Sequence, residues 1–298
     1  MLYEVNNLDI VITRNCQLDC SGCLTFSNHN KAKEHLNLED NLKYLDFWSD
    51  KLDVNTIHIF GGEPFMHPNL FDWVYAVRDS FRKKQTSKSK AINIQTNGIK
   101  ISSYDIDKLQ ILVNDCRLSI NITIHSKEQW YLEKINKAIA VIEKIYGTGH
   151  WEKINQTDKR YVNEKHIWVS VSDQTEKTWI NHYLGHGKTL RPSFEFDLSH
   201  YVANHSHCEA KEYVQLYKGN LYKCPPMAVL DETLKLYDYP NQSQWQPWLE
   251  YQPLFANSTD EEIKSWLDKQ KVPEKYCNMC FGSEEKNILH RIKVKKHE

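Results

Sequence analysis

Three cysteines lie within eight residues near the start of the chain: Cys16, Cys20 and Cys23. Cysteines grouped in this way, in a long chain that shows no secretory signal, indicate metal binding rather than disulfide bonds. Three thiolates can hold three irons of a four-iron, four-sulfur cube and leave the fourth iron open to a small molecule. A zinc ion completed by His29 or His35 is the alternative. The first group therefore predicts a metal centre and favours an open iron–sulfur cluster.

Four more cysteines lie in the last third of the chain: Cys208, Cys224, Cys277 and Cys280. Four thiolates can ligate every iron of a cluster, and they can also form a closed structural zinc site. The remaining cysteine, Cys116, stands alone in the segment NDCRLSI, just before an expected strand. We expect a packed core or surface thiol there, on the face away from the first metal centre. The two groups therefore predict one open and one closed metal site.

Polar residues and glycines follow three short apolar segments at the places where those segments end. They are Gly61, Gly62, Glu63 and Pro64 after IHIF, Thr96 and Asn97 after INIQ, and Thr123, His125 and Ser126 within NITIHS. Adjacent glycines let the backbone approach a ligand closely, and a carboxylate can accept hydrogen bonds from an ammonium group. Together they predict a polar ring on one edge of an apolar sheet, where His125 is a weak candidate for an acid or base.

The elements that would position these residues alternate between strand and helix patterns. The expected strands cover residues 9–13, 55–60, 91–95, 118–124, 166–172 and 193–197. The expected helices cover residues 38–50, 69–83, 103–113, 127–146 and 175–184. This alternation predicts a parallel sheet with right-handed crossovers, whose strands bring their carboxyl ends to one edge. Six repeats are fewer than the eight of a closed barrel, so we expect an α/β fold with a partial (β/α)6 barrel.

The alternation stops near residue 200, which divides the chain into a core, residues 1–200, and a small α+β domain, residues 201–298. In the second part, EYVQLYKGNLYKC predicts a hairpin with residues 218–220 at its turn, and a helix is expected near 259–270. In the first part, residues 147–165 are polar and are expected to form a long loop. These boundaries predict that the second cysteine group lies in a domain of its own.

Composition and charge exclude some classes of protein. The 298 residues are 40% hydrophobic and 26% charged, with a formal net charge of −1, which indicates a globular protein without a global basic or acidic field. No apolar run approaches the roughly 18 residues of a membrane span, and the segment MLYEVNN lacks a signal-peptide pattern. We therefore expect a cytoplasmic protein with no membrane contact. Two basic runs, 82–90 and 291–296, are expected to be solvated rather than bound to phosphate.

The order of these motifs resembles the radical S-adenosylmethionine (radical SAM) superfamily. C-x3-C-x2-C follows the first expected strand, GGEP the second and TNG the third, and the resemblance covers roughly residues 7–200. It implies that Cys16, Cys20 and Cys23 bind a four-iron cluster whose open iron takes the amino and carboxylate groups of SAM. Reductive cleavage of SAM would then give a 5′-deoxyadenosyl radical that takes a hydrogen atom from the substrate. An electron donor such as a flavodoxin or ferredoxin is an implied partner.

The same resemblance implies a set of residues that contact SAM. They are Gly22, Gly61, Gly62, Glu63, Pro64, Thr96, Asn97, Thr123, Ser126 and, more weakly, Ser172. The GGEP segment would hold the amino group, and the hydroxyl residues are candidates for the ribose or the carboxylate. The family commonly has an aromatic residue where this chain has Gly22, and there the backbone contacts adenine. Gly22 is therefore expected to keep that contact but to lack the hydrophobic cover.

The four later cysteines resemble the short "twitch" form of the SPASM extension in radical SAM enzymes, in the pattern C-x10-G-x4-C … C-x2-C. That form holds one auxiliary four-iron cluster, which the four thiols here would ligate fully. The resemblance thus implies two [4Fe-4S] clusters and SAM as cofactors. A four-cysteine zinc ribbon is the alternative that the spacing permits.

Together these features predict a radical SAM enzyme that acts on a small-molecule or nucleotide-like substrate. An auxiliary cluster can accept an electron from a substrate radical, so dehydrogenation of a sugar or aminocyclitol alcohol is favoured, as in the twitch-bearing aminoglycoside dehydrogenases that the chain resembles. A radical rearrangement or bond formation is also compatible. The alternatives are modification of a ribosomal peptide or of a nucleic-acid base and, outside the superfamily, a structural zinc protein that binds nucleic acid.

Overall fold

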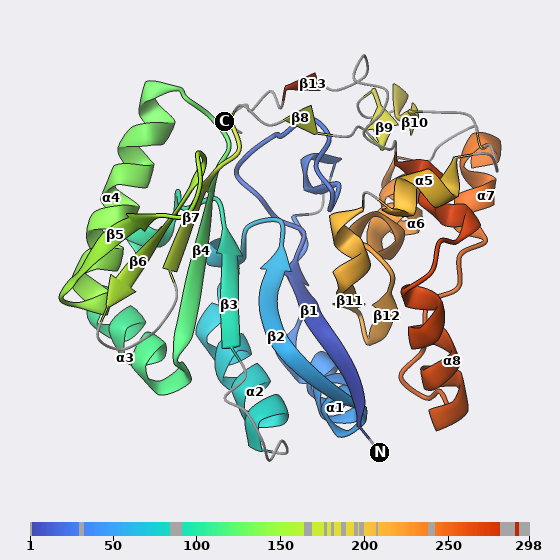
Figure 1. Ribbon diagram of the computed structural model, residues 1–298, viewed down its shortest axis with the longest axis horizontal. Helices are drawn as coiled ribbons and strands as arrows, with labels where there is room; N and C mark the ends of the chain where they lie inside the picture. Colours follow the sequence, from blue (N-terminus) through green and yellow to red (C-terminus); the bar gives the residue numbers. More distant parts are fainter. Residues whose placement is uncertain are drawn as a thin grey trace.

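The computed structural model centres on a sheet with the strand order β12-β11-β1-β2-β3-β4-β7-β6-β5 (Figure 1). The structure describes residues 2–29, 33–83, 91–163, 169–175, 178–179, 182–185, 189–193, 196, 200–206, 208–237, 242–280 and 290–291. Six neighbouring strands are parallel: β11 (Tyr213–Tyr217), β1 (Tyr3–Thr13), β2 (Leu52–Gly61), β3 (Ala91–Thr96), β4 (Leu118–Ile124) and β7 (Val169–Asp173). The expected α/β arrangement around a mostly parallel sheet is confirmed.

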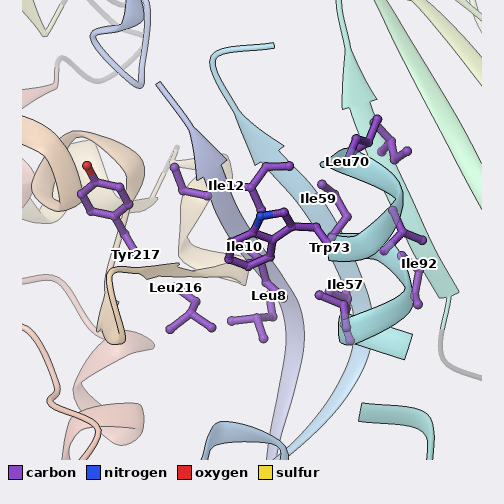
Figure 2. Close-up of a cluster of buried hydrophobic side chains, with 14 of the residues drawn as sticks. Leu8, Ile10, Ile12, Ile57, Ile59, Leu70, Trp73, Ile92, Leu216 and Tyr217 are labelled. Atoms are coloured by element: carbon purple, nitrogen blue, oxygen red, sulfur yellow. The ribbon is translucent and has the colours of Figure 1, made fainter. Parts of the chain in front are cut away.

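Helices cover one face of this sheet and bury its apolar side chains. They are α1 (Leu38–Lys51), α2 (Leu70–Lys83), α3 (Ile106–Cys116) and α4 (Gln129–Tyr146) (Figure 1). Every second residue of β1, namely Leu8, Ile10 and Ile12, lies on this face, and Trp73 of α2 packs there with them (Figure 2). This period of two explains why the strands near the first three motifs could be recognised from the sequence.

The opposite face of the same strands is polar. Asp9 of β1 is the register partner of His58 on β2 and of Gln215 on β11, and His58 is the partner of Asn93 on β3. Asn93 is in turn the partner of Ser119 on β4. All five side chains are buried. One row of polar side chains therefore crosses the inner face of the sheet. Along each strand these residues are offset by one position from the apolar residues that face the helices.

The prediction of a long loop at residues 147–165 is wrong. β5 (Gly149–Lys153) and β6 (Asp158–Asn163) form an antiparallel hairpin that pairs with β7 at the sheet edge. Arg160 donates to Glu152 from the neighbouring strand at 2.9 Å, and the Asn155 side chain accepts the N–H groups of Thr157 and Asp158 at the turn. Because polar side chains pair across this edge hairpin, its sequence lacks the alternation of apolar and polar residues that predicts a strand.

Two further expectations for the middle of the chain differ from the structure. In place of a helix at 175–184, the described residues form β8 (Thr178–Trp179) and β9 (Tyr183–Leu184), which pair with β13 (His290–Arg291) and β10 (Arg191–Pro192). Ser193 and Phe196 are not in a strand, and the remainder of the strand expected at 193–197 lies outside the described residues. The sixth parallel strand is β11 instead. Most of the two basic runs also lies outside the described residues.

The carboxyl-terminal part begins with α5 (Tyr201–Ser206) and the expected hairpin of β11 and β12 (Asn220–Tyr222). Its turn residues Lys218 and Gly219 have φ angles of 49° and 83°, as a two-residue hairpin turn of type I′ requires. Then follow α6 (Pro225–Leu236), α7 (Gln246–Leu249) and α8 (Asp260–Gln270), the last confirming the helix expected near 259–270. Because β11 pairs with β1, this part shares the central sheet with the core.

Short 3-10 helices occupy several of the connections. Their bounds are Ser27–His29, Pro64–Met66, Ile101–Ser103, Glu209–Glu212, Gln242–Trp245 and Lys275–Met279. Within the described part of the chain, none of the helices combines the length and the apolar character that crossing a membrane demands.

Candidate active site

A cavity of about 310 Å³ lies at the carboxyl ends of β1 to β4. Of the residues expected to act in the site, it is lined by Cys16, Cys20, Gly22, Cys23, Gly61, Gly62, Thr96, Asn97, Thr123 and His125. Residues from four separate loops of the chain thus reach one space, as the parallel strand order predicts. Glu63, Pro64, Ser126 and Ser172 do not line it.

The cysteine loop follows β1 and is tied to the loop after β3. The Leu18 backbone N–H donates to the Cys16 sulfur at 3.4 Å, and the Asn97 amide donates to the same sulfur at 3.7 Å. The Cys23 sulfur lies 3.3 Å from the Thr25 hydroxyl. Gly22 has a φ of +71°, in the left-handed region that favours glycine, so the path of the loop itself accounts for a glycine at this position.

Burial and neighbouring negative charges oppose the ionisation of two of the thiols. Burial raises the pKa of Cys16 and of Cys20, and it is raised further by Glu63 and Cys23 for Cys16 and by the other two thiolates for Cys20. Thiols must lose their protons to bind iron, and a cationic metal centre reverses this repulsion. Cys16, Cys20 and Cys23 are all free and all reach the cavity, so the donor set fits an iron–sulfur cluster.

Gly61 and Gly62 bring the end of β2 against the start of the cysteine loop. The N–H of Gly62 donates to Thr13 O and that of Glu63 to Asn15 O, both at 2.8 Å. A Cβ atom on Gly61 would lie 2.1 Å from Thr13 O, and one on Gly62 would lie 2.4 Å from Asn15 O. Both distances are too short for real atoms, so the two glycines are required for this close backbone approach.

Glu63 is completely buried and connects two loops of the site. Its carboxylate accepts hydrogen bonds from Phe65 N at 3.0 Å, the Thr96 hydroxyl at 2.7 Å and Asn97 N at 2.8 Å. Burial raises the pKa of Glu63 to about 7, although the three donors favour the ionised form. Pro64 begins the buried 3-10 helix that follows. In this geometry Glu63 positions the loop after β3 and does not face the cavity.

The hydroxyl candidates after β4 and β7 divide into two groups. Thr123 lines the cavity, whereas the Ser126 hydroxyl accepts the N–H of Glu128 at 3.1 Å near the start of α4. Ser172 donates to Asp158 at 2.6 Å across the β6–β7 pair. The structure therefore brings Thr123 to the site and engages the two serines elsewhere.

His125 lines the cavity and has one ring nitrogen available for a ligand. Among the described residues, nothing hydrogen-bonds its buried Nδ1 atom. Burial lowers the pKa of His125 to about 4, so the ring is neutral at neutral pH. An unpaired buried nitrogen is costly unless a ligand or water satisfies it, so Nδ1 of His125 can accept a hydrogen bond from a molecule in the cavity.

Neither histidine that could complete a zinc site lines the cavity. The ring nitrogens of His35 lie 2.9 Å from the Thr13 hydroxyl and 3.2 Å from the Asn15 amide, so both are engaged. The His29 ring packs against Tyr183 and Tyr237, at centroid distances of 5.0 and 6.0 Å. Neither His29 nor His35 is therefore placed to complete a zinc site in the cavity of the first cysteine group.

The four later cysteines come together from separate segments. Cys224 precedes α6, Cys208 precedes the 3-10 helix at Glu209–Glu212, and Cys277 and Cys280 lie in and after the one at Lys275–Met279. Burial raises the pKa of Cys280 to about 12, and the neighbouring charges of Cys208 and Cys277 add to this effect. Over the described ranges, no three His, Cys, Asp or Glu side chains are arranged around a single metal ion.

Cys116 lies away from both groups, as expected. It is fully buried at the end of α3, with the Arg78 guanidinium 3.9 Å from its sulfur, and it does not line the cavity.

Six polar residues that also line the cavity were not predicted from the sequence. They are Asp9, Ser21, Thr25, His58, Gln95 and Tyr213. A signal was present, because Asp9 and His58 interrupt the apolar strands LDIVIT and IHIF at alternate positions. These two positions formed no recognisable motif. Tyr213 and Gln215 lie beside β1 only because β11 pairs with it, and more than 200 residues of chain separate the paired residues.

Comparisons with known proteins place this geometry in context. Among solved structures, the chain is similar to BtrN in complex with AdoMet and 2-DOIA, with 13% identity, 94% of each chain covered and a TM-score of 0.48. It is similar to anSMEcpe with bound AdoMet, with 17% identity, 47% of this chain and 41% of that chain covered and a TM-score of 0.37.

A third similar structure is SuiB of Streptococcus suis bound to S-adenosylmethionine, with 11% identity, 91% of this chain and 67% of that chain covered and a TM-score of 0.34. No curated protein matches the chain. Residues 10–154 match the family model "Radical SAM superfamily", and this range contains the first cysteine group and the loops after β2, β3 and β4. The chain is thus an enzyme with a match to the radical SAM superfamily over residues 10–154, and members of that superfamily use a [4Fe-4S] cluster and SAM.

Proposed function

We propose that Cys16, Cys20 and Cys23 hold the SAM-binding cluster and that the chain uses it to oxidise a small polar substrate. The observation that carries this proposal is that all three thiols reach the same cavity as Gly61, Asn97 and His125. Three protein ligands leave one iron of a cube without a thiolate, and that iron is where SAM binds in the family.

The residues of the chain supply the surroundings of that chemistry. When bound, the cluster and SAM supply a 5′-deoxyadenosyl radical that can take a hydrogen atom from a substrate C–H bond. Leu18 N–H and the Asn97 amide donate to the Cys16 sulfur and thereby stabilise its negative charge. Thr123 and His125, across the cavity, are proposed to contact the nucleoside part of SAM.

Four residues expected to contact SAM do not line the cavity, so we propose other roles for them. Glu63 and Pro64 hold the loops that shape the SAM pocket, as the three donors to Glu63 indicate. Ser126 and Ser172 stabilise α4 and the β6–β7 pair.

We also propose that Cys208, Cys224, Cys277 and Cys280 hold an auxiliary [4Fe-4S] cluster in residues 201–298. The mutual effect of these thiols on their pKa values supports their closeness. Oxidation of an alcohol to a ketone removes a hydrogen atom, a proton and one further electron from the substrate. A cluster with four thiolates has no open iron, which suits an acceptor of that electron better than a substrate-binding centre.

Selective loss of each cysteine group tests both assignments. Replacement of Cys20 by Ala is expected to halve the iron content of the anaerobically reconstituted enzyme, from about eight irons to about four, and to abolish SAM cleavage. The double variant Cys208→Ala/Cys224→Ala is expected to retain about four irons and SAM cleavage but to form no oxidised product. Cys116→Ser is the matched control and should retain all the iron. Zinc with no iron in the unmodified protein would refute the proposal.

A further inference from the structure

Three buried polar side chains form a hydrogen-bonded chain on the inner face of the sheet, deeper than the cysteines. The Gln215 amide donates to Asp9 Oδ2 at 2.6 Å, and His58 Nδ1 lies 2.7 Å from Asp9 Oδ1. Asp9, His58 and Gln215 are register partners on three adjacent strands, so the backbone pairing fixes their spacing. Asp9 and His58 both line the cavity that contains the three thiols.

This chain sets the orientation and the tautomer of His58. A carboxylate can only accept hydrogen bonds, so Nδ1 carries the proton toward Asp9 and Nε2 is the acceptor of the neutral ring. None of the described residues hydrogen-bonds Nε2. A histidine held by a carboxylate on one nitrogen, with the other facing a cavity, is the arrangement by which proteins present an imidazole to a substrate.

The charge of the cavity limits what can bind to His58. Neither lysine nor arginine occurs among the described residues that line the cavity, and Asp9 is the carboxylate among them. Beside His58, a buried phosphate or carboxylate would meet the Asp9 carboxylate with no lysine or arginine of the lining to balance it, which is unfavourable. A hydroxyl group can donate to Nε2, and an ammonium group can do so while also being attracted by Asp9.

The depth of His58 leaves room for a substrate between it and the proposed SAM site. His58 precedes Gly61, at the mouth, by three residues of β2, which corresponds to about 10 Å along a strand. The whole cavity of about 310 Å³ is at the lower end of the range for small-molecule sites, and the cluster and SAM would share it, so only a compact substrate suits the part beside His58. The Asp9–His58 pair therefore lies at the inner end of a space suited to a compact ligand.

We propose that His58, held by Asp9 and Gln215, anchors the substrate by a hydrogen bond to one of its hydroxyl or ammonium groups, and that the substrate is a neutral or cationic polyol or amino sugar without a phosphate. This inference rests on the proposed function, because it takes the cavity to be the place where SAM and substrate meet. It adds the substrate class and the residue that selects it.

Calorimetric binding to the anaerobic, cluster-loaded and SAM-bound enzyme tests the inference. The probes are myo-inositol and glucosamine, with glucose 6-phosphate and AMP as anionic counterparts. We expect myo-inositol or glucosamine to bind and neither anion to do so. His58→Asn keeps an N–H group for Asp9 but removes the nitrogen that faces the cavity, and it should weaken that binding at least tenfold. His150→Asn, an exposed histidine, is the matched control and should bind normally.

A second measurement does not depend on the stability of the variant. In the unmodified holoenzyme, diethyl pyrocarbonate should modify His58, and a bound probe should protect it, as mass spectrometry of the digested protein would show. Equal binding by the His58→Asn variant and the unmodified enzyme, preference for a phosphorylated probe, or binding of none of the probes would overturn the inference. If the iron-loaded enzyme fails to produce 5′-deoxyadenosine from SAM, the proposed function itself fails, whatever binds at His58.

Discussion

At the scale of single residues, the two cysteine groups differ in what surrounds them. Cys16, Cys20 and Cys23 share a cavity with polar loops that leave space for a ligand, whereas Cys224 and Cys280 are enclosed by the elements that begin or end beside them. All seven of these cysteines are partly buried, so the contrast lies in the cavity that the first three share. The closed character of the second site remains our proposal.

Glu63 should give the protein a recognisable pH dependence of stability. Its folded-state pKa of about 7 exceeds the ordinary value of 4.5, so the folded state binds more protons than the unfolded state between these values. The stabilisation that the protonated Glu63 contributes to the free energy of unfolding is therefore fully present below about pH 4.5. It decreases as the pH rises through about 7, and the total loss is at most about 3 kcal/mol.

The Glu63→Gln variant cannot titrate and should lack this part of the slope. Denaturant unfolding of both proteins near pH 5 and near pH 7.5 measures the difference. Identical slopes would show that the carboxyl group ionises normally in the folded protein.

The cysteine and glycine motifs could be predicted from sequence because each one is local. CQLDCSGC, GGEP and TNG have fixed spacings, and six of the ten residues expected to contact SAM line the cavity, although their contact with SAM stays a prediction. The details that the structure adds are not local. The Glu63 carboxylate is engaged by hydrogen bonds from Thr96 and Asn97. The contacts of Asp9 become visible only in the fold, where β2 and β11 lie on either side of it.

At the scale of elements, the close contact between β2 and the cysteine loop depends on Gly62. Gly62→Ala would place a Cβ atom 2.4 Å from Asn15 O, and because that atom is backbone it cannot move without shifting the loop. We expect a loss of stability of about 1–3 kcal/mol and at least tenfold weaker SAM binding.

Gly147→Ala provides the matched control, since Gly147 has a φ of +78° but nothing within 4 Å of the added Cβ. Backbone strain alone should cost about 1–2 kcal/mol there and leave SAM binding unchanged. Equal SAM affinity in both variants would contradict the role assigned to Gly62.

Lys223 connects the second cysteine group to α8. Its buried ammonium group donates to Lys269 O at 3.2 Å, Val272 O at 2.7 Å and Glu274 Oε2 at 2.8 Å, just before Cys224. Lys223→Met would leave three acceptors unsatisfied in a buried place, so we expect a loss of about 3 kcal/mol.

Loss of the auxiliary iron should accompany that destabilisation, because the segment that carries Cys277 begins beside Glu274. Lys264→Met, which removes an exposed pair with Asp268, should cost less than about 1 kcal/mol and leave the iron content unchanged. Iron analysis and thermal unfolding of the two variants distinguish these outcomes, and similar effects in both would rule out the connection.

The elements that could be predicted are those whose pattern repeats within a short stretch. β1 to β4 and α1 to α4 have apolar residues at periods of two and 3.6, and all were expected within three residues of their bounds except the start of β1, which lies six residues before the expected one. The β5–β6 hairpin was missed because its strands exchange polar pairs such as Arg160 with Glu152. β11 was recognised as a hairpin strand, but nothing in its own sequence indicated that it would pair with β1.

At the scale of the whole molecule, that pairing makes the two parts of the chain depend on each other. β11 covers the edge of β1, and Leu216, the register partner of Ile10, packs beside Leu8 and Ile10 (Figure 2). The Trp48 indole of α1 also donates to Gly219 O in the β11–β12 turn at 2.9 Å. The boundary expected near residue 200 is therefore proposed as a boundary of function and not of folding.

A fragment that ends at residue 200 should consequently fail to fold as an independent domain. It would expose the unpaired edge of β1 together with the apolar surface under β11, which favours aggregation. Gel filtration and the cooperativity of thermal unfolding test this. A monomeric fragment that melts cooperatively and binds SAM would contradict the shared sheet.

The central claim is that three thiols hold a cluster whose open iron binds SAM. Electron–nuclear double resonance on the reduced Cys208→Ala/Cys224→Ala enzyme, mixed with SAM labelled with 15N at its methionine amino group, tests this without the auxiliary cluster. The account predicts a 15N coupling to the cluster signal that is absent with unlabelled SAM. A reduced four-iron signal without any 15N coupling, or no iron–sulfur signal in a fully reconstituted sample, would contradict it.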